Sequence, residues 1–312
     1  MPLVQRAQTL WQTLSDSGET PVFHRSGVIN LGPRPSLFIQ NAASGVKRYQ
    51  LPCELMTGAA VNALWSVLRV PEDYIGVFEP QAGYLKSELA IARYISLAEK
   101  AGCAQLFNCG VTDINLADGV VQVKTREGSR YQGRKLLVAA GTWVKQLLPS
   151  LPITPVRKVF SWHQADGRFS EDNHFPAFTV EAPDDNHYYG FPALENALKV
   201  GKHTGGQRIT APEQRKPFGS LAEDGTEVFG FLSTFLPGVG VCLNGQSYIY
   251  DLFPDEDFII DTLPEHDNVL VISGLSGHGF KFASVLGERS RFRFNAVFAA
   301  PLCRRLITSR RR

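Results

Sequence analysis

The stretch SELAIARYISLAEKAGCAQLFNCGVTDINLADGVVQVKTREGSRYQGRKLLVAAG (87–141) decides the fold, because it predicts a helix, a strand, two hairpins and a second strand in that order. Residues 87–102 have the period of a helix, with Ser87 as its N-cap and Gly102 beyond its end. The inward face of this helix is predicted to hold Leu89, Ala92, Ile95 and Ala98.

The rest of that stretch predicts strands. Residues 103–109 predict one strand, and the pairs Asp118-Gly119 and Glu127-Gly128 predict the turns of hairpins. Residues 135–141 form a continuous apolar run that ends in glycine, as is typical of a buried parallel strand. Together these elements predict part of an α/β nucleotide-binding domain.

The flanking sequence predicts a second kind of architecture. Residues 23–32 and 71–85 predict strands, and residues 152–241 predict an antiparallel sheet of short aromatic strands. Residues 268–288 predict a strand, a glycine-rich loop and the start of a helix. An N-terminal helix is predicted from an apolar face of Ala7, Leu10, Trp11 and Leu14. The predicted fold class is therefore α/β plus antiparallel β.

Composition excludes several classes of protein. Of the 312 residues, 44% are apolar and 20% charged, which excludes a wholly disordered chain. No apolar run reaches the roughly 18 residues that a bilayer span needs, so we expect no membrane association. The five scattered cysteines lack metal-ligand spacing, and they predict reduced thiols, no metal site and a cytoplasmic location.

The C-terminal residues 289–312 form a basic tail, with eight arginines and no acidic residue, on an otherwise acidic chain. Two interpretations stand: a solvated extension, or a contact for nucleic acid or lipid. The tail lacks interleaved aromatic and basic residues, so the solvated extension is favoured and no nucleic-acid partner is predicted.

Two segments have the residue types of a binding site. The loop containing Gly274, Gly277 and Gly279 precedes a helix, and this predicts either a phosphate or flavin contact or a simple tight turn. In residues 197–203 a strand would place Lys199, Gly201 and His203 on one face. That face predicts either a desolvated lysine that attracts an anion or oxygen species, or a merely solvated lysine. The aromatic residues Tyr189, Phe191 and Tyr250 predict either a pocket or ordinary core.

Several phrases occur in the order found in one known family: RSGVINLGP (25–33), SELAIARYISLAEKAGCAQLFNC (87–109), ALKVGKH (197–203), FPDEDFIIDTLP (253–264) and GLSGHGFKFASVLGE (274–288). Through residues 1–288 the chain resembles the monomeric sarcosine oxidase family of flavin-dependent amine oxidases. The resemblance implies an FAD-binding, incomplete Rossmann-like domain (87–150 and 242–288), a substrate domain with an antiparallel sheet (1–86 and 151–241), and the tail (289–312).

The resemblance also implies the reaction. Family members oxidise the N-methyl group of an amino acid, using FAD, and the imine hydrolyses to formaldehyde and the free amino acid while O2 becomes H2O2. The expected partners are thus a small N-methyl amino acid and O2, and the expected state is a monomer.

Site residues are implied position by position. Lys199 matches the lysine beside the flavin that activates O2, His203 matches an active-site histidine, and Tyr189 and Tyr250 match tyrosines that line the cavity. Lys281 matches the lysine at the flavin loop that holds the substrate carboxylate. The expected cofactor contacts are Ala140, Gly141, Thr142, Gly277, His278, Gly279 and Lys281.

The sequence departs from the family in two places within this region. No G-x-G-x-x-G fingerprint is present in these residues. Tyr248 stands six residues before Pro254, where the family has the cysteine that bonds covalently to FAD, so no covalent link is expected. The alternative to an active oxidase is an inactive remnant that does not bind FAD.

Overall fold

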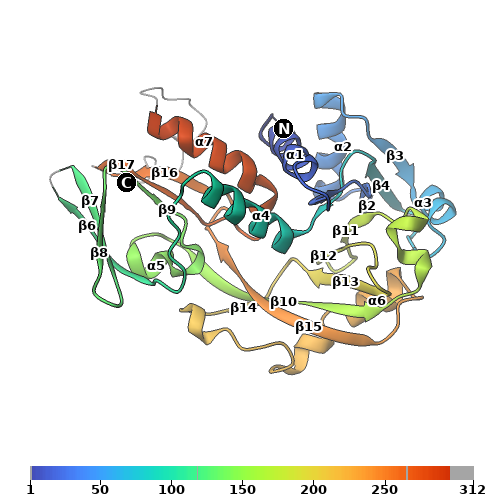
Figure 1. Cartoon of the computed structure of the whole chain (residues 1–312). Helices are drawn as coiled ribbons and strands as arrows, with labels where there is room; N and C mark the ends of the chain where they lie inside the picture. The colour runs from blue at the N-terminus through green and yellow to red at the C-terminus, as the bar shows by residue number, and fades with distance from the viewer. Residues whose placement is uncertain (1, 118, 265, 296–312) are drawn as a thin grey trace.

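Two sheets of unlike size carry most of the strands (Figure 1). The computed structural model describes residues 2–117, 119–264 and 266–295. Among these residues the larger sheet has nine strands, in the order β14-β10-β13-β12-β11-β2-β4-β3, with β15 also paired to β10. Their bounds are β2 Val28–Pro33, β3 Glu54–Thr57, β4 Tyr74–Glu79, β10 Thr154–Gln164, β11 Ala177–Glu181, β12 His187–Gly190, β13 Ala197–Lys202, β14 Gln207–Arg208 and β15 Cys242–Leu252.

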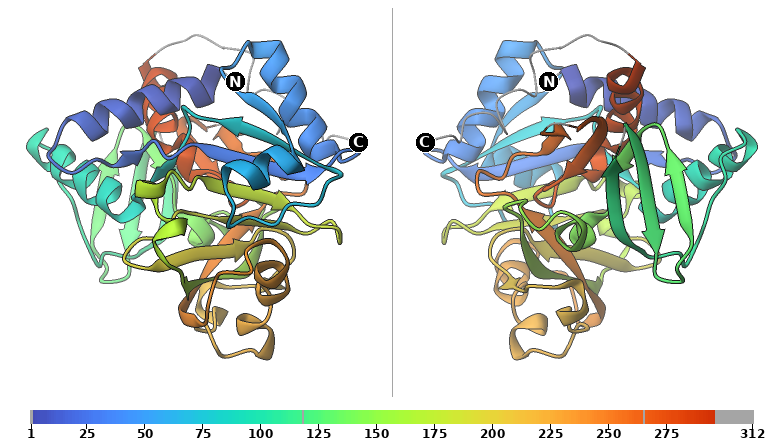
Figure 2. Two further views of the ribbon diagram at one scale, coloured as in Figure 1. Left: turned by 90° about the vertical axis from the view of Figure 1, so that its right-hand side faces the viewer. Right: turned by 90° about the vertical axis from the view of Figure 1, so that its left-hand side faces the viewer.

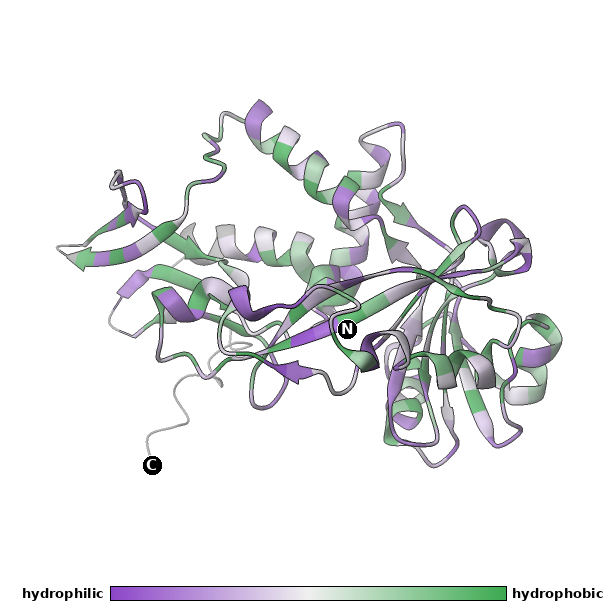
Figure 3. Cartoon of the chain, turned by 90° about the horizontal axis from the view of Figure 1, so that it is seen from below, coloured by the Kyte–Doolittle hydropathy of each residue, from purple (hydrophilic) through white to green (hydrophobic). Residues whose placement is uncertain are grey.

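The large sheet confirms the antiparallel sheet predicted for residues 152–241. Its pairs are antiparallel apart from β2 and β11, which run parallel. The strand β15 pairs with β10 from Leu252 to Cys242. The predicted domain division assigned β15 to the FAD-binding domain, whereas in the structure it is also a strand of the large sheet. Hydrophobic and hydrophilic residues alternate along many strands and helices (Figure 3).

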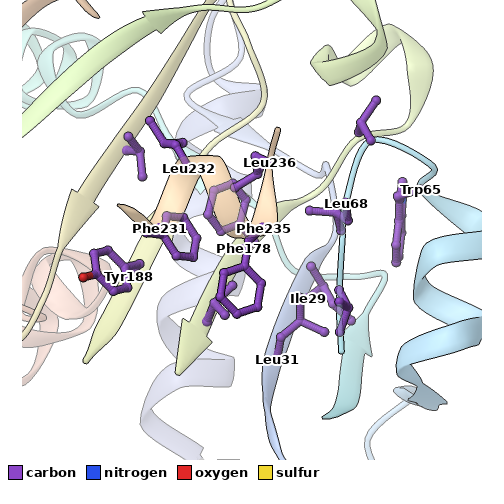
Figure 4. Packing of buried hydrophobic residues seen from close by; sticks show 14 of the residues in the cluster. Ile29, Leu31, Trp65, Leu68, Phe178, Tyr188, Phe231, Leu232, Phe235 and Leu236 are labelled. Carbon is purple, nitrogen blue, oxygen red and sulfur yellow. The ribbon is translucent and has the colours of Figure 1, made fainter. Parts of the chain in front are cut away.

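An aromatic core fills the space against the large sheet (Figure 4). Helix α6, Phe229–Phe235, inserts Phe231, Leu232 and Phe235 into this core. The ring of Phe231 stacks on Tyr188 of β12, with centroids 4.4 Å apart. Offset or stacked aromatic pairs of this kind add to the free energy gained by burying their area. The core thus fixes the face of the sheet that is turned away from solvent.

The strands predicted for the α/β nucleotide-binding domain form a three-stranded sheet. Its order is β16 (Ile259–Leu263), β17 (His266–Ser273) and β9 (Leu136–Val138). The strands β9 and β17 run parallel, as predicted from the apolar run 135–141. Burial was predicted throughout that run, but Leu137 is 41% exposed. Among the described residues β9 is an edge strand that pairs with β17 alone, so Leu137 is not enclosed between two neighbouring strands.

The predicted hairpins are confirmed. They form a separate sheet of β6 (Val111–Ala117), β7 (Val120–Thr125) and β8 (Arg130–Gly133), which lies at the far end of the molecule from β3 (Figure 1). Gly119 and Gly128 have positive φ, as the turns require. The other half of the first turn, Asp118, lies outside the described residues.

The strand predicted for residues 103–109 is wrong. These residues form turns and irregular backbone, and Phe107 is 67% exposed. An isolated strand has no ladder to satisfy its backbone N–H and C=O groups, and no neighbouring strand pairs with this segment. Its alternation of apolar residues therefore did not suffice to make a strand.

A helical layer of α1 (Pro2–Asp16), α4 (Ser87–Lys100) and α7 (Ala283–Asn295) packs together on one side of the molecule (Figures 1 and 2). The predicted N-terminal helix is confirmed, with Ala7, Trp11 and Leu14 buried. The basic tail predicted from residue 289 begins inside α7, and residues 296–312 lie outside the described part of the chain.

Helix α4 has the predicted bounds but not the predicted face. Ala90 is its one buried residue, whereas Ala92 and Ile95 are exposed. The contact is made by the side of α4 that carries Ala90, because α1 lies there. The predicted cap is also wrong: Lys86 occupies the N-cap position, and the Ser87 hydroxyl donates to Glu88.

The remaining elements are short apart from α2, which has 13 residues. They are β1 Phe23–His24, β5 Tyr84–Leu85, α2 Leu37–Tyr49, α3 Gly58–Leu64, α5 Val144–Leu147 and the 3-10 turns η1 Gly141–Trp143, η2 Gly167–Phe169, η3 Glu171–Asn173, η4 Pro212–Gln214, η5 Ala222–Gly225 and η6 Phe280–Phe282. None of the helices in the described residues has the length and apolar character needed to cross a bilayer.

A buried ion pair fastens the segment around η5 to the large sheet. Arg157 of β10 donates to both carboxylate oxygens of Asp224, at 2.8 and 2.7 Å. The Arg157 guanidinium also donates to the backbone oxygens of Lys216 and Pro217 and to Gln207, so its N–H groups are satisfied. The side chains of Arg157 and Asp224 are 3% and 1% exposed. Removing one partner of an ion pair this deeply buried leaves the other charge uncompensated, which strongly destabilises the fold.

Replacement of Asp224 by asparagine is expected to lower the free energy of unfolding by about 3–5 kcal/mol, because the Arg157 charge stays buried without its partner. The matched control is Asp166→Asn, which breaks an exposed pair with Arg168 and is expected to cost less than about 1 kcal/mol. Urea unfolding monitored by circular dichroism measures both. Equal losses in the two variants would contradict the assignment of Asp224 to a buried structural pair.

Candidate active site

The glycine-rich loop after β17 is held in one conformation by Ser276. The Ser276 N–H donates to the Asp251 backbone oxygen at 3.0 Å, and the Ser276 hydroxyl donates to the Gly274 backbone oxygen at 3.2 Å. The loop also needs glycine for space. A Cβ on Gly277 would lie 2.3 Å from the ring of Tyr250, and Gly277 has a φ of 80°. Position 277 therefore requires glycine, both because the ring of Tyr250 leaves no room for a side chain and because the backbone turns tightly before α7.

A cavity of about 330 Å³ opens beside this loop. Its lining comes from three segments: residues 139–141 after β9, residues 248–251 of β15, and residues 272–280 from the end of β17 into η6. The parallel strands β9 and β17 both end here, and the carboxyl ends of parallel strands are where α/β sheets bind ligands. The volume is in the range of small-molecule sites.

The cavity brings together several predicted residues from distant parts of the sequence. Gly141, Gly277, Gly279 and Tyr250 line it. Thr142 follows Gly141 in η1 and is buried. Ala140 packs instead against the apolar core under the small sheet.

A chain of hydrogen-bonded rings extends from the cavity into the large sheet. The hydroxyls of Tyr189 and Tyr248 are 2.9 Å apart, and Tyr248 donates to the Tyr250 hydroxyl at 3.5 Å. The Tyr250 hydroxyl lies 3.2 Å from His203 Nδ1. The ring of His278 is 6.3 Å from that of His203. Of the predicted residues, Tyr189, His203 and Tyr250 thus form one hydrogen-bonded cluster with Tyr248, and His278 lies beside it.

Burial sets the protonation of this cluster. Desolvation raises the pKa of Tyr189, Tyr248 and Tyr250 above the usual tyrosine value. Desolvation, reinforced by the charge of Lys158, lowers the pKa of His203 to about 4. At neutral pH the phenols are therefore protonated and the imidazole is neutral.

Lys199 lies in a box of aromatic rings. Its Nζ is 3.9 Å from the ring centroid of Phe160, 5.5 Å from that of Trp162 and 5.8 Å from that of Phe191. Desolvation lowers the pKa of this half-buried lysine, and the charge of Glu88 opposes that shift. The interpretation as a merely solvated lysine is therefore wrong, because aromatic faces hold the ammonium.

Other side chains separate Lys199 from the cavity. It does not line the cavity, but Phe160 packs against both Lys199 and Tyr248, whose ring centroid is 5.4 Å from that of Phe160. One aromatic layer thus separates the ammonium from the cavity wall.

Lys281 follows the glycine-rich loop and is solvent-exposed. Its backbone oxygen accepts from Trp11 Nε1 at 2.8 Å, which joins α1 to the start of α7. The charge of Lys281 contributes to the lowered pKa of His203 and of His278. Lys281 therefore lies near the histidines of the cluster but outside the lining of the cavity.

Sequence reasoning missed a buried lysine. Lys158 of β10 is 2% exposed and donates to the backbone oxygens of Thr204 and Gly205. Its Nζ is 5.7 Å from the ring centroid of Tyr250, and desolvation lowers the pKa of Lys158 to about 8. The available signal was that Arg157 and Lys158 stand between Val156 and Val159 in a predicted strand, where two adjacent charges need partners on opposite faces.

Comparison with known proteins shows close sequence relatives. An N-methyl-L-tryptophan oxidase from Citrobacter koseri is 59% identical over 288 residues, which cover 92% of this chain and 77% of the relative. An N-methyl-L-tryptophan oxidase from Yersinia pestis is 60% identical over the same coverage.

Solved structures show the same fold at low identity. NikD, an amino acid oxidase essential for nikkomycin biosynthesis, superposes with a TM-score of 0.80 at 19% identity, covering 96% of this chain and 80% of NikD. Glycine oxidase from Geobacillus kaustophilus gives a TM-score of 0.78 at 16% identity, with coverage of 96% and 80%. The predicted α/β plus antiparallel β fold class is confirmed.

The family assignment rests on nearly the whole described chain. Residues 1–290 match the family of FAD dependent oxidoreductases. The resemblance noted in the sequence is confirmed by the relatives of 59% and 60% identity. This chain belongs to the FAD dependent oxidoreductase family.

Proposed function

We propose that this chain is an FAD-dependent oxidase that removes the N-methyl group of N-methyl-L-tryptophan. The observation that carries the proposal is the 59% identity over 288 residues with an enzyme of that name. In the balanced reaction, the N-methyl amino acid, O2 and water give L-tryptophan, formaldehyde and H2O2. The inactive-remnant alternative is not favoured, because identity of this level extends through the cavity-forming segments.

The residues around the cavity fit a flavin. Gly141, Gly274 and Gly277 have positive φ and leave the backbone open to a flat ring, and the start of α7 directs a positive dipole end toward the loop. Bound FAD supplies the two-electron oxidant for the N-methyl C–H bond. The predicted contacts Ala140, Gly141, Thr142, Gly277, His278, Gly279 and Lys281 hold it.

The neighbouring side chains bind the substrate and O2 in this proposal. Lys281 holds the substrate carboxylate by charge, while Tyr189 and Tyr250 line the space for the side chain. His203, neutral at pH 7, fixes the Tyr250 hydroxyl by a hydrogen bond. Lys199 places a positive charge one aromatic layer from the cavity, where it stabilises the negative charge that develops as O2 is reduced. The aromatic box favours that charge.

The broader organisation is proposed on the same basis. A substrate domain comprises residues 1–86 and 151–241, an FAD-binding domain comprises 87–150 and 242–288, and the basic tail comprises 289–312. The strand β15 connects the two domains through its pairing with β10. We propose a cytoplasmic monomer that binds neither membrane nor nucleic acid.

The first test measures H2O2 from the flavin-loaded chain with N-methyl-L-tryptophan. We expect Lys199→Met to lower the rate about 10²–10³-fold under air, the loss typical for removing a positioned charge or donor. The control Lys124→Met removes an exposed lysine of β7 and should leave the rate unchanged. An inactive parent that binds FAD would overturn the proposed substrate or activity, and equal rates in parent and Lys199→Met would overturn the role of Lys199.

A second test concerns the link between protein and flavin, which we propose is non-covalent. Tyr248 is a buried phenol whose pKa is raised by desolvation, so it offers no anionic nucleophile at neutral pH. Acid precipitation of the flavin-loaded chain should leave the flavin absorbance in the supernatant, for the parent and for Tyr248→Phe. Flavin that stays in the parent's pellet but not in that of Tyr248→Phe would show that Tyr248 forms a bond after all.

A further inference from the structure

Lys158 contacts both partners of one hydrogen bond at the cavity. This bond joins His203 Nδ1 to the hydroxyl of Tyr250, which lines the cavity. On the histidine side, Lys158 Nζ donates to the backbone oxygens of Thr204 at 2.6 Å and Gly205 at 3.1 Å. These two residues directly follow His203 in the chain. On the tyrosine side, the same Nζ lies 5.7 Å from the ring centroid of Tyr250, within the range of a cation–π contact.

The turn that Lys158 holds is rich in glycine. Gly205 and Gly206 have φ of 69° and 102°, a region that glycine enters readily, and glycine leaves the backbone many other conformations. A Cβ on Gly206 would lie 2.7 Å from Lys158 Cδ, so the turn lies directly against the stem of the lysine. The two hydrogen bonds from Lys158 therefore restrict a part of the backbone that glycine alone would leave free.

Packing alone does not account for an ammonium group at this position. Lys158 is 2% exposed, and moving an ammonium out of water costs free energy that a carboxylate partner would offset. The acceptors of Lys158 are backbone oxygens instead, and the nearby carboxylate of Glu227 pairs with Lys202, at 3.6 Å. An ammonium suits this place because the turn offers two acceptors and Tyr250 offers an aromatic ring.

We propose that Lys158 is a positioning residue, which holds His203 and Tyr250 at hydrogen-bonding distance and in one orientation. It acts through the turn after β13 and through the Tyr250 ring, and it lies outside the described lining of the cavity. The consequence for catalysis rests on the proposed function, in which Tyr250 lines the space for the substrate side chain. A ring that is already in place binds substrate without first being ordered.

The hydrogen bond to Tyr250 selects one tautomer of His203. Tyr248 donates to the Tyr250 hydroxyl, which leaves the proton of that hydroxyl for His203 Nδ1. Desolvation, and after it the charge of Lys158, lowers the pKa of His203 to about 4, so the imidazole is neutral at pH 7. A neutral imidazole whose Nδ1 accepts a hydrogen bond carries its own proton on Nε2.

The first measurement reads this tautomer by NMR of the full chain, labelled with 15N in histidine, at pH 7. The chain has seven histidines, and the signals of His203 are assigned by their loss in His203→Gln. In the parent we expect one ring nitrogen of His203 to have the shift of an N–H nitrogen and the other that of a bare nitrogen. In Lys158→Met the two shifts should converge, because the tautomers mix once Tyr250 no longer holds Nδ1.

Two variants separate the contacts of Lys158 from a general change of charge. Lys158→Arg keeps a cation with N–H donors and should recover part of the separation between the two shifts. Lys202→Met removes the lysine next to His203, which pairs with Glu227, and should leave the spectrum of His203 unchanged.

The second measurement compares H2O2 production from N-methyl-L-tryptophan by the flavin-loaded chains. A displaced Tyr250 ring weakens substrate binding, so Lys158→Met should raise KM about fivefold, as for one lost hydrogen bond, and change kcat by less than about twofold. Lys158→Arg should have a KM between those of Lys158→Met and the parent, and Lys202→Met should match the parent.

Several results would overturn the positioning role. One is a parent in which His203 already shows mixed tautomers, and another is a single tautomer that persists in Lys158→Met. Equal changes at all seven histidines would mean that the variant disturbs the whole fold. A lower kcat with unchanged KM would assign Lys158 to the chemical step. An inactive parent in which the His203 tautomer still depends on Lys158 would support the positioning role and overturn the proposed function alone.

Discussion

The register between β10 and β15 is the constraint on which the site depends. The two strands pair from Thr154 opposite Leu252 to His163 opposite Cys242, with an irregularity between Trp162 and His163. Because side chains alternate along a strand, Tyr248 and Tyr250 share one face of β15. A shift of one residue would turn both rings to the other face and break the hydrogen bonds to Tyr189 and His203.

The neighbouring strand β10 uses the same alternation for two buried charges with different tasks. Arg157 faces Asp224 and secures the segment around η5, whereas Lys158 faces the tyrosine cluster. Arg157 has a carboxylate partner, whereas Lys158 donates to the backbone oxygens of Thr204 and Gly205. The same strand therefore carries one group that stabilises the fold and one whose charge depresses the pKa of His203.

Sequence patterns predicted which segments form helices and strands better than they predicted which residues pack against those segments. Periodicity located α1, the hairpins and β17, since those patterns are local. It failed for residues 103–109 and for the buried face of α4, because the presence of a pairing strand or a packing helix is decided elsewhere in the chain. The resemblance pointed to Tyr250, which lines the cavity, but nothing in YIYDLF distinguishes Asp251, which lines it as well.

The packing of α1 on α7 bears on how the chain folds as it is synthesised. The Ser284 hydroxyl donates to the Ala7 backbone oxygen at 3.2 Å, and Val285 shares a core with Trp11, although some 270 residues separate them. Contacts this distant in sequence close late, because a long loop must be ordered first. The apolar face of α1 therefore leaves the ribosome long before its partner exists. Until then, Ala7, Trp11 and Leu14 are available to a chaperone or to aggregation.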